Sequence, residues 1–128
     1  MFTLHFTPQE ANQRLPLVRS IVKEIIDKGR VFRAYLAEYE DHELPVEADK
    51  IRCNVQHLLV ELEDLGCYFK DWNFEQGIVD FPSEINGEEV LLSWCADEEE
   101  VLYYHGVDDG YAARKLIPKK LLKEKVPA

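Results

Sequence analysis

The sequence predicts an α+β fold, in which a long antiparallel helical hairpin packs on a small antiparallel β-sheet. Apolar residues recur every three or four positions through residues 8–40 and again through residues 46–65, which is the period of amphipathic helices. After Gly66 the apolar period changes to two, which is typical of half-buried strands. The dipeptide Asn86-Gly87 stands between two such strands and is the strongest signal for a two-residue hairpin.

The domain organisation follows from these periods. We expect one α+β domain over residues 1–117, since 128 residues suffice for one core. Within it, the helical hairpin occupies residues 8–66, and the sheet is formed by residues 67–117 with an N-terminal strand at 2–6. Residues 118–128 form a lysine-rich, basic C-terminal tail.

Composition and charge restrict the partners. A hydrophobic content of 46% excludes a disordered chain, and a formal charge of −10 would repel phosphates, so we expect no nucleic-acid and no membrane partner. No apolar run reaches the roughly 18 residues of a membrane span. The N-terminus lacks the pattern of a signal peptide, and the cysteines Cys53, Cys67 and Cys95 are scattered as free thiols, so a cytoplasmic location is expected.

The first helix has a clear beginning and an internal proline. Thr7 can act as the N-cap, Pro8 suits the first helical position, and Glu10 completes a capping box. Pro16 should kink the helix near residues 12–16, because it removes a backbone hydrogen bond.

The two helices differ in length. At about 1.5 Å per residue, a helix over residues 8–40 is roughly 50 Å long and one over residues 46–65 roughly 30 Å. The first helix therefore extends beyond the second, and either the sheet or a second copy of the chain must cover the apolar stripe of this overhang. We therefore expect a homodimer through the helical hairpin, and the alternative is a bend at Pro16 that folds the overhang onto the sheet.

The hairpin turn sets the register of the sheet. Around Asn86-Gly87, residues whose numbers add to 173 should face each other, so Asp80 opposes Ser93. An odd-length acidic loop at residues 96–100 would then place Ser93 opposite Tyr103. One face becomes apolar and should pack on the helices, with a buried Trp94; its members are Val79, Phe81, Leu92, Trp94, Leu102 and Tyr104. The other face gathers Asp80, Ser93, Tyr103 and His105.

The second face contains the candidate site. His105 can transfer a proton, and Asp80 can orient it. Asp108 lies in the following glycine-rich loop, and Arg114 could hold a carboxylate or a phosphate by a bidentate contact. Alternatively, the polar set is an ordinary solvated sheet face, and Arg114 forms a structural pair with Asp108 or Asp109.

Several stretches resemble a bacterial family called domain of unknown function 2203, over roughly residues 3–115. These stretches are residues 7–18, 61–71 and 77–82, followed by Trp94, Tyr104-His105, Gly110-Tyr111-Ala112 and Arg114. In that family a glutamate often follows the histidine, whereas this chain has Gly106. The resemblance implies a fold and a site location but no established activity.

Two functions remain open. The first is a small binding or regulatory module, with Asp80, His105, Asp108 and Arg114 holding a small anionic ligand. The second is a small hydrolase-like or metal-dependent enzyme that uses His105 and Asp80. The first is preferred because the sequence contains no phosphate-binding loop, no nucleophile elbow and no convincing set of metal ligands, so no metal is assigned.

Overall fold

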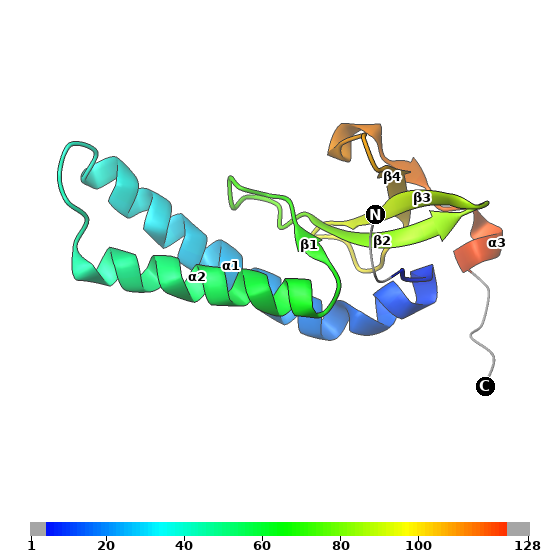
Figure 1. Ribbon diagram of the computed structural model, residues 1–128, viewed down its shortest axis with the longest axis horizontal. Coiled ribbons are helices and arrows are strands. Elements are labelled where there is room, and N and C mark those ends of the chain that lie inside the picture. The colour runs from blue at the N-terminus through cyan, green and yellow to red at the C-terminus, as the bar shows by residue number, and fades with distance from the viewer. Residues whose placement is uncertain (1–4, 123–128) are drawn as a thin grey trace.

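The computed structural model of the protein describes residues 5–122 and confirms the predicted α+β fold. Two long helices lie side by side, and a five-stranded antiparallel sheet in the order β1-β2-β3-β4-β5 packs against one end of the pair (Figure 1). The elements are α1 Pro8–Glu38, α2 Val46–Asp64, β1 Tyr68–Phe69, β2 Val79–Ile85, β3 Glu88–Trp94, β4 Tyr103–Gly106, the 3-10 helix η1 Tyr111–Ala113, β5 Lys115–Leu116 and α3 Lys119–Leu122.

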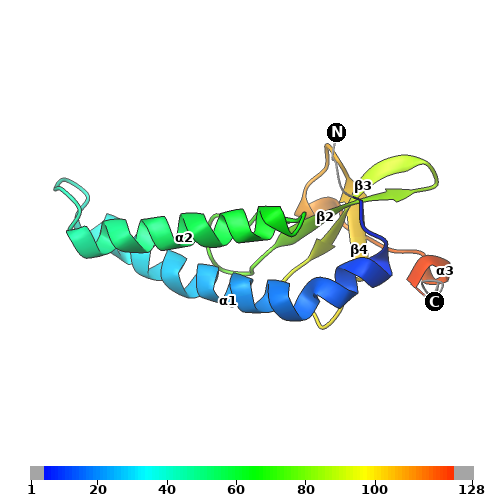
Figure 2. The same ribbon diagram turned by 60° about the horizontal axis from the view of Figure 1, so that its bottom comes forward.

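The start of α1 has the expected cap. The Thr7 hydroxyl accepts a hydrogen bond from the Glu10 backbone, and the Glu10 carboxylate accepts one from the Thr7 backbone, which completes the capping box. Pro16 lies inside the helix, and the N-terminal part of α1 bends beneath the strands (Figure 2). The bend follows from the hydrogen bond that proline cannot make.

The sheet covers the overhang of the longer helix. Ala11, Leu15, Val18 and Val22 of α1 are buried in one core with the apolar face of the sheet. The second half of α1 instead pairs with α2, and together they form a two-helix arm that extends beyond the sheet (Figure 1). The sheet therefore covers the overhang without a second copy of the chain. If the protein is a homodimer, the contact between the copies must involve the two-helix arm.

The hairpin register agrees with the prediction at every residue. Asn86 (φ 54°) and Gly87 (φ 82°) both have positive φ, as a type I′ turn requires, and Asp80 pairs with Ser93. Ser93 also pairs with Tyr103, so the acidic loop has the expected length. Trp94, with 0% exposed surface, lies in the core. The faces of the hairpin are therefore assigned correctly, but Leu102 lies before β4 and outside the core, where Val101 is buried instead.

The two ends of the chain differ in part from the prediction. Most of the strand expected at residues 2–6 lies outside the described residues. At its described end, Phe6 has no strand assignment but donates a backbone hydrogen bond to Pro82 of β2. At the other end, β5 and α3 extend the fold, although the periodicity predicted neither strand nor firm helix there. Leu121 and Leu122 of α3 pack against the core, which is why this part of the basic tail is ordered.

Candidate functional site

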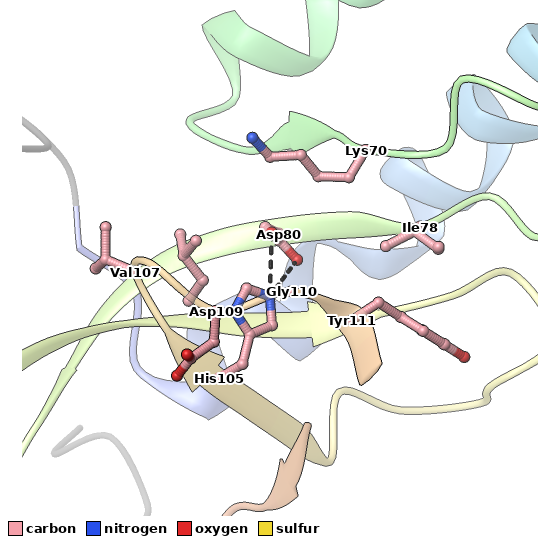
Figure 3. A pocket seen from close by; sticks show the side chains of 9 residues that line it. Lys70, Ile78, Asp80, His105, Val107, Asp109, Gly110 and Tyr111 are labelled. Carbon is pink, nitrogen blue, oxygen red and sulfur yellow. Dashed lines mark hydrogen bonds and ion pairs between the residues drawn. The ribbon is translucent and has the colours of Figure 1, made fainter. Parts of the chain in front are cut away.

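The candidate site lies on the sheet face opposite the helices. Asp80 is on β2 and His105 is on β4, and the middle strand β3 separates them. Their side chains meet over β3, with 3.3 Å from His105 Nε2 to each Asp80 carboxylate oxygen (Figure 3). Both side chains are only 4% exposed. The predicted proximity of Asp80 and His105 is thus confirmed.

The hydrogen bonds of His105 determine its tautomer. Nδ1 lies 2.8 Å from the Gly106 carbonyl oxygen, which can only accept, so Nδ1 carries a proton. Nε2 then faces two carboxylate oxygens, and the contact is favourable only if the pair holds one more proton. Burial raises the pKa of Asp80, while the nearby positive charges of His105, Lys70 and Arg114 oppose that rise. A proton on the Asp80 carboxyl, the form that burial favours, satisfies this contact because that carboxyl can then donate to His105 Nε2.

This pair forms the floor of a pocket of about 250 Å³. Lys70 and Asp109 bring one charge of each sign to its lining (Figure 3). The remaining lining residues are Ile78, Leu91, Val107, Gly110 and Tyr111. The pocket thus combines apolar walls with a hydrogen-bonded pair at its floor and two oppositely charged groups.

Asp108 and Arg114 do not line the pocket. Asp108 is exposed in the loop after β4, and its neighbour Asp109 lines the pocket instead. An added Cβ at Gly106 would lie 2.6 Å from Asp109 Oδ2, so the Asp109 carboxylate occupies the space that a side chain at position 106 would need. A glutamate at position 106 would therefore collide with the Asp109 carboxylate, whereas glycine fits.

Arg114 belongs to a neighbouring cluster. Its guanidinium stacks between Tyr103 and Tyr111, at 4.3 and 4.1 Å from their ring centroids. It donates to Glu98 Oε1 at 2.9 Å and to the Tyr111 hydroxyl at 3.1 Å. The structural pair is therefore with Glu98 of the acidic loop. Since Tyr111 lines the pocket, Arg114 acts on the site by positioning that ring.

The acidic loop is held from both sides. Arg19 of α1 donates to the carbonyl oxygens of Ala96, Glu98 and Glu99, and the Asn12 side chain accepts from the Val101 backbone. These contacts connect polar residues on α1 to the loop between β3 and β4. They fix the loop whose Glu98 holds Arg114 and, through it, Tyr111.

Two further polar side chains lie near the pocket. The Ser93 hydroxyl, next to Asp80 in the ladder, is the only buried side-chain nitrogen or oxygen without a hydrogen-bond partner among residues 5–122. Burial, followed by a hydrogen bond to Asp97, raises the pKa of the Cys95 thiol to about 12. Cys95 therefore remains a thiol at neutral pH and is no nucleophile. In the part of the chain that the structure describes, no three His, Cys, Asp or Glu side chains are arranged to hold a metal ion.

The comparison with protein families assigns the chain to a family. Residues 5–117 match the model of an uncharacterised conserved protein family, DUF2203. The chain belongs to this family. No curated protein and no solved structure matches it. Within residues 5–122, none of the helices has the length and apolar character that a membrane crossing requires.

Sequence reasoning named only two of the nine lining residues, Asp80 and His105, as site residues. Lys70 follows β1, which pairs with β2 so that Lys70 comes close to Asp80. The sheet expected from residue 67 onward could have indicated Lys70. Ile78 lies two positions before Asp80, so period-two alternation could have placed it on the same face. No periodic signal marks Tyr111, which reaches the pocket from outside the strands.

Proposed function

We propose that the protein is a small-molecule-binding module whose site is the pocket above the Asp80–His105 pair. The observation that carries this proposal is the pair itself, because two buried, hydrogen-bonded ionisable groups line a cavity instead of being enclosed by packed side chains. Buried ionisable groups that line a pocket are typical of functional sites.

The ligand is a small organic anion with a compact apolar part. Lys70 is exposed and has no carboxylate within ion-pair distance among the described residues, so it can pair with the ligand's acidic group. Ile78, Leu91 and Val107 suit the apolar part. A volume of about 250 Å³ lies just below the usual lower limit of roughly 300 Å³ for ligand pockets, which restricts the ligand to a few heavy atoms.

Ligand binding is favoured over catalysis because both ring nitrogens of His105 are already engaged within the protein. Nδ1 donates to Gly106 and Nε2 faces Asp80, so neither ring nitrogen is directed at a ligand. The pair can donate or accept a hydrogen bond through Asp80, and this orients a ligand without chemical change.

The proposal also includes a bacterial origin, which follows the family resemblance, and a cytoplasmic location. Cys53, Cys67 and Cys95 are all free, which is typical of a reducing compartment.

Calorimetric titration with matched ligand pairs tests the proposal. Isobutyrate and benzoate have the shape and charge that the pocket requires, whereas isobutyramide and benzamide keep the shape without the charge. We expect the acids to bind at least about tenfold more tightly than the amides, and Lys70→Gln to remove that preference. Lys23→Gln, which removes an exposed lysine on α1, should leave binding unchanged. Equal binding of acids and amides, or no binding of any of the four, would contradict the proposal.

A further inference from the structure

The two-helix arm has a second hollow, which shares no lining residue with the pocket above Asp80 and His105. α1, α2 and the loop between β1 and β2 enclose an apolar groove of about 320 Å³. Phe32, Leu36, Val55, Trp72 and Phe74 line it, together with Arg33 and Arg52 at its edges. We refer to this surface as the arm groove.

Large apolar side chains are exposed at the arm groove. Trp72 is 61% exposed and Leu36 is 45% exposed. Two helices alone can bury only the faces that they turn toward each other, so an arm without a third layer leaves apolar surface in water. Tryptophan and arginine are also the side chains that contribute most often to protein–protein binding energy.

Charge divides the arm into two segments. Lys28, Arg30 and Arg33 follow one another on α1 with no acidic residue among them. Arg30 and Arg33 donate to the carbonyl oxygens of residues 73–75 and, within residues 5–122, form no ion pair with a carboxylate. Residues 38–49, at the end of the arm, contain six acidic side chains and neither lysine nor arginine. A basic segment therefore lies beside an acidic one.

The acidic end of the arm also carries exposed apolar side chains. Leu44 is in the loop between α1 and α2, and Val46 begins α2 at 66% exposed. The arm end thus combines apolar side chains with negative charge, whereas the arm groove combines an apolar hollow with positive charge. The two surfaces of one chain are complementary to each other.

We propose that the arm groove binds the arm end of a second copy of this chain in an isologous dimer. The centre of the basic segment lies about eight residues, or roughly 11 Å, before the end of α1, where the acidic segment begins. Two antiparallel arms related by a two-fold axis near Leu36 place each basic segment against the partner's acidic segment. The same arrangement directs Leu44 and Val46 of each copy toward the other's groove. It is closed, because both complementary contacts are used once per copy.

Charge reversal tests the pairing directly. Arg33→Glu and Glu40→Arg each place like charges against each other twice in the dimer. Light scattering and sedimentation should show a wild-type dimer whose dissociation constant rises about tenfold or more in either variant. Lys23→Glu, an exposed charge reversal on α1 outside both segments, is the matched control and should leave the dimer intact.

Mixing the two single variants is the decisive test. In the mixed dimer the two substituted side chains face each other at one contact, and the native Arg33 and Glu40 face each other at the other contact. Both contacts therefore regain opposite charges, and the mixture should dimerise at the wild-type concentration. The double variant Arg33→Glu/Glu40→Arg should do the same. A monomeric wild type at about 0.5 mM, a dimer insensitive to both reversals, or a mixture that stays monomeric would each overturn the proposal.

Discussion

The Asp80–His105 pair is the residue-scale feature on which the site depends. It exists because β3 pairs with both β2 and β4 in a register that brings Asp80 and His105 to the same face, with Ser93 opposite Asp80 and Leu91 opposite His105. The pair is buried and hydrogen-bonded, so its protonation is linked to the stability of the fold.

The raised pKa of Asp80 gives that linkage a direction. The folded state keeps the proton on Asp80 at pH values where the unfolded state has already lost it, so folded molecules bind more protons and stability falls as pH rises. In Asp80→Asn the amide can donate to His105 Nε2, and this contribution to the pH dependence disappears. Urea unfolding of both proteins should show the wild type losing unfolding free energy relative to Asp80→Asn as pH rises from about 4. If the wild type instead lost unfolding free energy relative to Asp80→Asn as pH falls, the folded state would favour the carboxylate form of Asp80.

At the scale of elements, the loop between β1 and β2 joins the sheet to the arm. The Asp71 carboxylate accepts backbone hydrogen bonds from Glu75, Gln76 and Gly77, and this closes the loop. Phe74 has a positive φ of 55° and places its ring directly over Gly29 of α1. A glycine inside a helix usually weakens it, but here the missing Cβ provides the space for the ring.

Gly29→Ala should therefore destabilise the protein, although the same change in an exposed helix stabilises by about 1 kcal/mol. The added Cβ would collide with the Phe74 ring, and we expect a loss of about 1–3 kcal/mol in the free energy of unfolding, measured by denaturant titration.

Phe74→Leu in the Gly29→Ala background is the control for that experiment, because a smaller side chain should recover part of the loss. If Gly29→Ala raised the unfolding free energy instead, the packing of the loop on α1 would be wrong.

Elements whose interactions are local were predictable. The capping box depends on Thr7 and Glu10 three residues apart, and the register depends on Asn86-Gly87, so both follow from neighbouring residues. Contacts between distant segments were not predictable. Arg114 reaches Glu98 through the stacking of two tyrosines, and the sequence offered Asp108 and Asp109 as equally charged partners. Period-two alternation identifies Asp80 and His105 on one face, but it cannot identify loop residues such as Tyr111, whose position depends on tertiary packing.

At the scale of the whole molecule, the sheet has one buried apolar face and one face that carries a pocket. α1 packs on the apolar face and also holds the acidic loop through Arg19, whose guanidinium lies 5.1 Å from the centroid of the Trp94 ring. The Trp94 indole donates to the Glu98 carbonyl oxygen at 2.8 Å. Trp94 thus connects the helical layer, the sheet and the loop that supports the pocket.

The two tryptophans of the chain form a matched pair for testing this arrangement. Trp94→Ala should lower the free energy of unfolding by about 3–5 kcal/mol, because it empties the centre of the core. Trp72→Ala, at the largely exposed position on the arm groove, should cost less than about 1 kcal/mol at concentrations where the chain is monomeric. Denaturant titrations that gave similar losses for both variants would mean that the core is not centred on Trp94.

The measurement that tests the central claim most directly is a ¹H–¹⁵N NMR titration of the protein with isobutyrate. The pocket above the Asp80–His105 pair predicts saturable shifts, below about 10 mM ligand, in the amides of Lys70, Ile78, His105, Asp109 and Tyr111, and their loss in Lys70→Gln. The resonances of amides on the arm groove, such as those of Leu36 and Val55, should not shift. Shifts centred on the arm groove, or pocket shifts unchanged in Lys70→Gln, would contradict the assignment of this pocket as the binding site.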